Sequence, residues 1–217
     1  MEKKIQAVIF DMDGVIVDSE FVYMKYLYAF AKEKNPAMTM EELNPMVGRS
    51  RQDSWEIMAR AVKNGESWEE LLREFAALNI YDKVHYREIF RPEAKTLTTE
   101  LRKRGYRTAL ASSTGPKLIA RIVEETGMRT EFDLFVSGGQ FKQSKPNPEI
   151  YHYTAKTLGV AEEECFVIED STVGILAAKR AGMTVAALRD ERFGFDQSPA
   201  DVHINGLLDV LDYLPGV

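Results

Sequence analysis

An apolar run near the start of the chain ends abruptly in two aspartates and a glycine. Residues 5–10, IQAVIF, have no polar face from Ala7 onward, which is typical of a strand buried on both sides in a parallel sheet. Asp11, Asp13 and Gly14 follow directly. Because side chains alternate along extended backbone, both carboxylates are expected to point the same way. Ligands bind at the carboxyl ends of strands in open parallel sheets, and a site explains this pair better than a helix N-cap does.

Asp11 and Asp13 would place two negative charges at a buried strand end. Such carboxylates repel each other and are costly to remove from water. A divalent cation that prefers oxygen ligands would offset both charges. The residue pattern therefore predicts a metal site at this strand end.

The composition of the 217-residue chain argues against several other classes of protein. Acidic residues outnumber basic residues by 34 to 28, and no long basic block occurs, so we expect no nucleic-acid partner. No apolar stretch approaches the ~18 residues of a spanning helix, and the N-terminus lacks the features of a signal peptide, so we expect no membrane partner. The single cysteine, Cys165, fits a reducing cytosol and a place in the core. We expect a cytoplasmic protein that acts as a monomer.

Two kinds of pattern divide the chain. Residues 18–85 show helical spacing and no clear strand, whereas strands and helices alternate afterwards. This alternation predicts an α/β fold with a parallel, Rossmann-like sheet. We expect a core domain of residues 1–17 and 86–217 and an all-helical domain of residues 18–85, inserted as a lid after the site-bearing loop. The pattern predicts helices at 84–89, 93–104, 116–125, 148–158, 173–181 and 206–214, and strands at 107–111, 132–136, 166–168, 184–188 and near Val202.

Hydroxyl residues follow the predicted strand 107–111. Ser112, Ser113 and Thr114 are consecutive there. Small hydroxyls and backbone N–H groups at a strand end can hold a phosphate oxygen. The same residues also suit an ordinary cap on the next helix, and taken alone this second interpretation is favoured.

Charged residues follow the next two predicted strands. Lys145 is fixed just before a proline, and Glu169 and Asp170 end the strand at 166–168. Near the two aspartates, the lysine would act as a counter-charge and a phosphate ligand. Adjacent side chains of a strand point in opposite directions, so one of the two acids is expected to face the ligand. The other would act through water or orient the lysine.

Four segments resemble the motifs of the haloacid dehalogenase (HAD) superfamily. They are DMDGVIVDS, LASST, SKPNPEIY and VIEDSTVGILAAKRAGM, in the order of that superfamily. The helical insertion resembles its C1 cap, as in sugar-phosphate phosphatases, phosphoglycolate phosphatases and β-phosphoglucomutase. The resemblance therefore implies a HAD core with a C1 cap, and a cis peptide bond between Lys145 and Pro146.

The resemblance implies a role for each matching residue. Asp11 would be the nucleophile that takes the phosphoryl group, and Asp13 would be the general acid and base. Mg²⁺ would be bound by Asp11, the backbone carbonyl of Asp13 and Asp170, with Glu169 beside them. The transferring phosphoryl group would be held by Ser112, Ser113 and Lys145.

These roles predict a Mg²⁺-dependent phosphatase that hydrolyses a small phosphorylated metabolite, for preference a sugar phosphate, through an aspartyl phosphate. Within the superfamily, Asp13 argues against dehalogenation, because a halide leaving group needs no proton. Receiver-type signalling domains form an alternative class, since they too gather acids, a hydroxyl and a lysine around Mg²⁺. The D-x-D-G motif, the insertion and the Glu169–Asp170 pair count against that class.

β-Phosphoglucomutase is the enzyme alternative. The segment 48–54 resembles the mutase's sugar-gripping loop, with Arg51 in the place of its phosphate-holding arginine. The mutase also carries a histidine early in its cap, whereas here Tyr23 stands near that place and no histidine precedes His85. We expect Glu20, Tyr23, Arg49 and Arg51 to be the cap residues that contact the substrate, although a solvated helix start explains the two arginines equally well.

Overall fold

The computed structural model describes residues 4–47 and 51–214. The chain forms two compact units: residues up to Asp18 belong with residues from Tyr86 onward, and Ser19–His85 form the second unit. The expected domains, residues 1–17 and 86–217 with an inserted domain of residues 18–85, stay a prediction. Within the described residues, no helix combines the length and the apolar character needed to cross a membrane.

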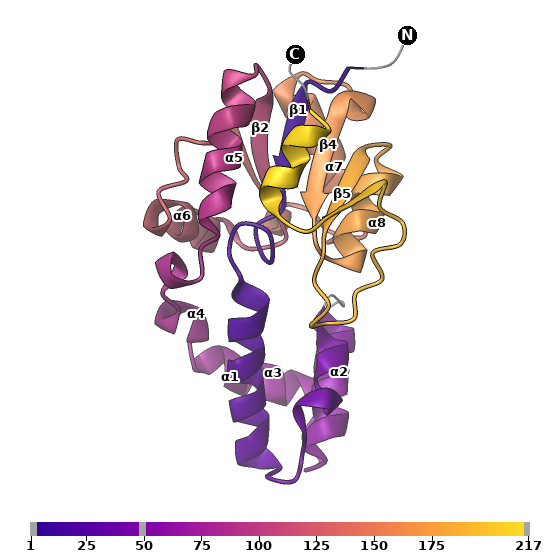
Figure 1. Cartoon of the computed structure of the whole chain (residues 1–217). Coiled ribbons are helices and arrows are strands. Elements are labelled where there is room, and N and C mark those ends of the chain that lie inside the picture. The colour runs from indigo at the N-terminus through magenta and orange to yellow at the C-terminus, as the bar shows by residue number, and fades with distance from the viewer. Residues whose placement is uncertain (1–3, 48–50, 215–217) are drawn as a thin grey trace. The chain divides into compact units, whose positions relative to one another are not determined.

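A six-stranded sheet forms the centre of the first unit (Figure 1). All its neighbouring strands are parallel, as the α/β pattern predicts. The central strand β1 is entirely buried because all four of its residues are apolar. The strands are β1 (Ala7–Phe10), β2 (Arg107–Ser112), β3 (Leu134–Ser137), β4 (Cys165–Glu169), β5 (Thr184–Leu188) and β6 (Val202–Ile204), in the spatial order β3-β2-β1-β4-β5-β6.

Helices cover both faces of this sheet (Figure 1). On one face, Ala7 and Ile9 share a buried apolar cluster with residues of α7 and α8. On the other face, α5 packs beside the 3₁₀ helix Leu207–Asp212. Alternation along β1 therefore supplies apolar side chains to both layers. The helices of this unit are α5 (Pro92–Lys103), α6 (Pro116–Glu125), α7 (Glu149–Leu158) and α8 (Thr172–Arg180).

The second unit contains only helices among its described residues. Its core holds the rings of Phe30, Trp55 and Phe75, whose centroids lie 5.4 to 6.4 Å apart. Ser67 caps the helix that begins at Trp68 and forms a capping box with Glu70. The unit consists of α1 (Ser19–Lys34), α2 (Arg51–Val62), α3 (Trp68–Ala77) and α4 (Ile80–Lys83), with 3₁₀ turns at Met40–Glu42 and Asn44–Met46.

One predicted helix is wrong and another is a 3₁₀ helix. The single helix expected at 84–89 is replaced by α4 and a 3₁₀ turn at Tyr86–Glu88, because Asn79 takes a left-handed conformation before α4 and Val84 is extended after it. The helix expected at 206–214 is a 3₁₀ helix. There the guanidinium of Arg104 donates to the carbonyls of Leu211 and Leu214. The other elements of the first unit lie within two residues of their predicted bounds.

Candidate active site

The register of the sheet aligns the residues that follow β1, β2 and β4. Phe10 pairs with Leu110 on one side and with Ile168 on the other. The backbone N–H of Asp11 donates to the carbonyl of Ile168 at 2.9 Å, which continues the sheet by one residue. The carboxyl ends of three adjacent strands therefore meet at Asp11, as expected for an open parallel sheet.

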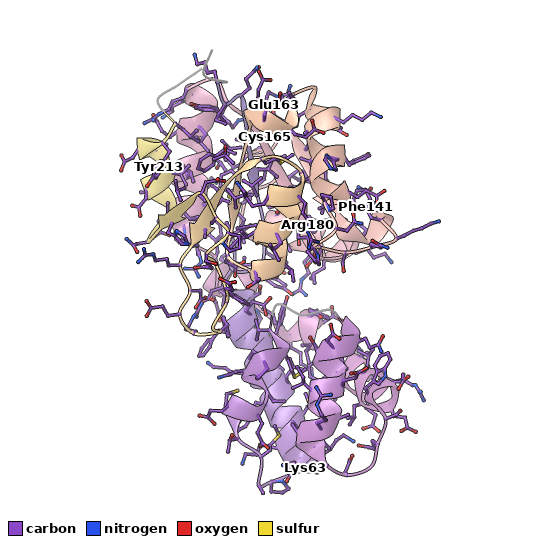
Figure 2. The ribbon with its side chains drawn as sticks, turned by 90° about the vertical axis from the view of Figure 1, so that its right-hand side faces the viewer. Lys63, Phe141, Glu163, Cys165, Arg180 and Tyr213 are labelled. Atoms are coloured by element: carbon purple, nitrogen blue, oxygen red, sulfur yellow. The ribbon has the colours of Figure 1, made fainter. Side chains whose placement is uncertain are left out.

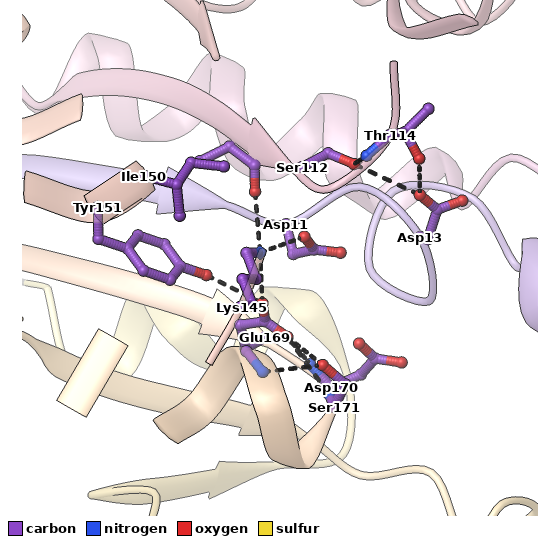
Figure 3. A network of polar contacts seen from close by, with 12 residues as sticks. Asp11, Asp13, Ser112, Thr114, Lys145, Ile150, Tyr151, Glu169, Asp170 and Ser171 are labelled. Carbon is purple, nitrogen blue, oxygen red and sulfur yellow. Dashed lines mark hydrogen bonds and ion pairs between the residues drawn. The ribbon is translucent and has the colours of Figure 1, made fainter. Parts of the chain in front are cut away.

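A buried lysine holds the acids of this edge together (Figure 3). The Lys145 Nζ donates to Asp11 Oδ1 at 2.6 Å, to Glu169 Oε1 at 2.7 Å and to the Ala111 carbonyl at 3.0 Å. The Lys145–Pro146 bond is cis, which confirms that prediction. We call Lys145, Asp11 and Glu169 the buried ion cluster.

Burial controls the protonation of this cluster. Removal from water raises the pKa of Asp11 to about 8; the Lys145 ammonium opposes this shift, and the carboxylates of Glu169 and Asp13 add to it. Burial alone would lower the pKa of Lys145, but the charges of Asp11 and Glu169 outweigh it and hold that pKa well above its usual value. Lys145 therefore keeps its positive charge beside both acids.

Glu169 is fixed by hydrogen bonds to both of its carboxylate oxygens. The Tyr151 hydroxyl donates to Oε1 at 2.9 Å, next to the lysine. The backbone N–H of Asp170 and both the N–H and the hydroxyl of Ser171 donate to Oε2. A Cβ at position 174 would lie only 1.8 Å from Glu169 Oε1, so Gly174 makes room for this carboxylate against α8. Glu169 thus orients the lysine, which is one of the two roles that the strand pattern leaves open.

Three acids at this edge could together hold a metal ion. Oxygen atoms of Asp11, Glu169 and Asp170 lie within 4.8 Å of one another, and all three residues are buried. Gly14 has φ +82°, and a Cβ there would lie 2.0 Å from Asp170 Oδ2, so the glycine leaves space beside that carboxylate. Hard divalent cations prefer such all-oxygen donor sets.

Asp13 lies beside the hydroxyl residues that follow β2 (Figure 3). The Thr114 hydroxyl donates to Asp13 Oδ2 at 2.7 Å, and the Ser112 hydroxyl approaches the same oxygen at 3.4 Å. Ser112 is buried, whereas Ser113 is exposed. Every core residue that the sequence predicts for the site therefore lies on this sheet edge or on the loops that follow it.

Three residues of the site were not predicted from the sequence. The sequence shows Thr114 only as one of three consecutive hydroxyl residues and does not indicate its contact with Asp13. Tyr151 is buried, and its ring lies 4.9 Å from the Lys145 Nζ, whereas the sequence predicts only a helix at 148–158 there. The sequence around Gly174 does not indicate that this glycine makes room for Glu169; it shows only a glycine within a predicted helix.

The predicted cap residues belong to the second unit. Glu20 and Tyr23 are half-buried on α1, and the ring of Tyr23 contacts the ring of Tyr81 edge-on at 5.1 Å between centroids. Arg49 lies outside the described residues, and Arg51 is the first residue of α2. Their roles toward a substrate stay predictions.

Cysteine and histidine supply no nucleophile or base at the sheet edge. Cys165 is buried at the start of β4 (Figure 2), and burial raises the pKa of its thiol to about 12. His85, His152 and His203 are exposed. His152 contacts the carboxylate of Glu162, and His203 contacts the backbone carbonyl of Gln197. The charged groups that the structure gathers at this edge are therefore the acids and the lysine.

Comparison with known proteins agrees with the geometry. A family described as haloacid dehalogenase-like hydrolase matches residues 5–182. The chain belongs to this family. It is 29% identical to a phosphorylated carbohydrates phosphatase of Thermotoga maritima over 82% of each chain. It is 28% identical to hexitol phosphatase B of Escherichia coli, covering 96% of this chain and 95% of that one.

Solved structures of HAD enzymes share the fold. A β-phosphoglucomutase from Clostridium difficile superposes with a TM-score of 0.77 at 24% identity, over 97% of this chain and 96% of that one. This likeness establishes the HAD fold, Rossmann-like core included. The chain is therefore an enzyme of the HAD hydrolases, as its four motifs predict.

Proposed function

We propose that this enzyme is a Mg²⁺-dependent phosphatase that hydrolyses a small phosphorylated metabolite, preferentially a sugar phosphate, through a phosphoryl group carried on Asp11. The observation that carries this proposal is the buried ion cluster, in which one lysine links Asp11 to Glu169 at the sheet edge. The names of two relatives, a phosphorylated carbohydrates phosphatase and a hexitol phosphatase, support the substrate class.

The acids of the sheet edge suit Mg²⁺. We assign Asp11, the backbone carbonyl of Asp13 and Asp170 as its ligands, with Glu169 beside them. All of these are oxygen donors, and the acids lie close enough to share one ion. When bound, Mg²⁺ supplies positive charge that offsets the negative charge of the phosphoryl oxygens.

The residues of the chain carry the two chemical steps. A carboxylate oxygen of Asp11 attacks phosphorus in line, and the bond between phosphorus and the ester oxygen breaks. Asp13 gives its proton to that leaving oxygen. Asp13 then takes a proton from water, whose oxygen attacks the same phosphorus, so that inorganic phosphate leaves and Asp11 is regenerated. Ser112, Ser113 and Lys145 hold the phosphoryl oxygens throughout.

Hydrolysis is favoured over the mutase reaction. The relatives named as phosphatases are 28% and 29% identical, whereas the mutase noted above is 24% identical and shows the fold alone. No histidine precedes His85, so the cap histidine of the mutase has no counterpart. Phosphorus NMR of β-glucose 1-phosphate with catalytic β-glucose 1,6-bisphosphate separates the two reactions. Conversion to glucose 6-phosphate faster than phosphate release would reverse this preference.

Phosphate release from a panel of phosphorylated sugars and acids tests the proposal. We expect turnover of sugar phosphates with Mg²⁺, and none in excess EDTA or in Asp11→Asn. Asp196→Asn makes the same chemical change at an exposed loop residue and should keep full activity. Undiminished activity of Asp11→Asn would sink the mechanism. A phosphorylated protein that persists without turnover would favour the receiver-type alternative.

A further inference from the structure

Asp13 is held by a residue to which the HAD motifs assign no role. The Thr114 hydroxyl donates to Asp13 Oδ2 at 2.7 Å, which is the length of a strong bond to a carboxylate. The Ser112 hydroxyl lies at 3.4 Å from the same oxygen and contributes far less. Thr114 is therefore the principal hydroxyl partner of this oxygen.

The backbone of Thr114 is fixed on both sides. Its N–H donates to Ser112 Oγ at 3.0 Å, and its carbonyl accepts from Ser137 Oγ at 2.7 Å. Ser112 and Ser137 are paired residues at the ends of β2 and β3. The branched Cβ of threonine further restricts the rotation of its side chain. The hydroxyl of Thr114 is thus aimed by the sheet itself.

Asp13, by contrast, lies on the turn that leaves β1 and is half-buried. Its carboxyl can rotate, and only one orientation suits proton transfer to a leaving oxygen. A fixed donor on Oδ2 restricts this rotation and so favours one orientation of the carboxyl. Because Asp13 acts on the ester oxygen, its orientation affects esters whose leaving group needs a proton.

We propose that Thr114 is a positioning residue that orients the Asp13 carboxyl for protonation of the leaving group. This inference rests on the proposed function, in which Asp13 is the general acid. Thr114 touches the acid and acts through it, so its removal should affect poor leaving groups selectively.

The test compares Thr114→Val, which lacks the hydroxyl at nearly the same shape, with Thr114→Ser, which keeps it. Single-turnover release of the leaving group is measured with 4-nitrophenyl phosphate and with an alkyl phosphate such as a hexose 6-phosphate. General acid catalysis contributes roughly 10²–10⁴-fold, so we expect Thr114→Val to lose about 10- to 100-fold on the alkyl ester and much less on the nitrophenyl ester. Thr114→Ser should restore the alkyl rate, and the exposed Thr96→Val should change neither.

Equal losses on both esters, or none on the alkyl ester, would overturn the inference, and so would a Thr114→Ser variant that behaves like Thr114→Val. If Thr114→Val does not fold, Thr114→Ala gives the same comparison without the added methyl. Asp13→Asn distinguishes a failure of the proposed acid role of Asp13 from a failure of the positioning role of Thr114. If Asp13→Asn loses both esters equally, the proposed acid role fails; if it discriminates and Thr114→Val does not, only the role of Thr114 fails.

Discussion

Two clusters in the first unit each join one cation to two carboxylates at similar distances, but their cations differ in burial. In the buried ion cluster, Lys145 lies 2.6 and 2.7 Å from two carboxylates, and the side chains are 4%, 10% and 1% exposed. In a second cluster, Arg192 lies 2.7 Å from Asp18 and 2.6 Å from Asp190. There the arginine is 40% exposed and Asp18 is 31% exposed, whereas Asp190 is 8% exposed. We call Arg192, Asp18 and Asp190 the surface ion cluster.

From this comparison we infer that burial, more than distance, decides how much an ion pair contributes to stability. Near the surface, water screens the charges, and holding long side chains in place offsets most of the attraction. In the interior, each charge depends on its partners because water cannot replace them. The buried ion cluster is therefore costly to break, and burial shifts the pKa values of Asp11 and Lys145, which is typical of functional sites.

Removing the buried cation should have the largest effect. Lys145→Met replaces the ammonium by an apolar chain of similar length and leaves the carboxylates of Asp11 and Glu169 unpaired. We expect the free energy of unfolding to fall by about 3–5 kcal/mol. We also expect kcat to fall at least ~10²-fold, because a charge that holds the phosphoryl group is lost. Urea unfolding and phosphate release measure both effects, and a fully active variant would contradict the role of Lys145.

The two clusters should respond to pH with opposite sign. The Asp11 pKa rises from 3.8 to about 8 on folding, so the folded protein keeps a proton that the unfolded chain loses between these values. The free energy of unfolding therefore falls as the pH rises through this window, by at most about 1.4 kcal/mol per unit. Partial burial would raise the pKa of Asp190, but its bonds to Arg192 outweigh burial and lower it. Asp190 therefore adds stability above its usual pKa, and this stability is lost on acidification through its lowered pKa.

Urea unfolding in EDTA across pH 3 to 8 measures this contrast. Asp11→Asn should flatten the decline between pH 4 and 8, and Asp190→Asn should change the curve only at the acidic end. Parallel curves for the wild type and Asp11→Asn would show that the buried carboxyl is not protonated in the folded state.

Gly174→Ala should have an intermediate effect on the buried ion cluster. The added methyl would overlap Glu169 Oε1, and this carboxylate cannot move without breaking its bonds to Lys145 and Tyr151. Such overpacking lowers stability by about 1–3 kcal/mol, and activity should fall because Lys145 is displaced. At Gly115 nothing lies within 4 Å of the new methyl, so Gly115→Ala is the matched control. Equal melting temperatures for the two variants would contradict this account.

Removing the surface cation should have the smallest effect. Arg192→Met is the counterpart of Lys145→Met and takes away the bidentate contact with Asp18. Exposed pairs contribute about 0–1 kcal/mol, and salt screens them further. Urea unfolding at low and high salt should show a small loss that disappears in salt. A loss as large as that of Lys145→Met would overturn the comparison.

The sequence predicts the elements whose signals are local. Residues 116–125 and 184–188 form a helix and a strand with the predicted bounds, because proline, glycine and apolar spacing mark their ends. The acids and the lysine are predictable for a related reason: charged residues that follow apolar runs have few structural explanations. The α/β class then follows from the order of strands and helices alone.

Contacts between distant segments cannot be predicted in this way. Thr114 meets Asp13 only because β1 and β2 pair in one particular register. The last helix is a 3₁₀ helix, and Arg104, the residue after α5, donates to the carbonyls at its end. Neither the register nor this capping leaves a pattern in the local sequence. Residues that position the catalytic groups are consequently harder to predict than the groups themselves.

The central claim is that Asp11 carries the phosphoryl group, and it can be tested by trapping. Asp13→Asn should accept a phosphoryl group from 4-nitrophenyl phosphate, because that leaving group needs little protonation, and should then release it slowly for want of a base. After an acid quench, peptide mass mapping should find one hydroxylamine-sensitive phosphoryl group on Asp11. The double variant Asp11→Asn/Asp13→Asn should carry none. A burst of nitrophenol without phosphorylated Asp11, or with the phosphoryl group on another residue, would contradict the account.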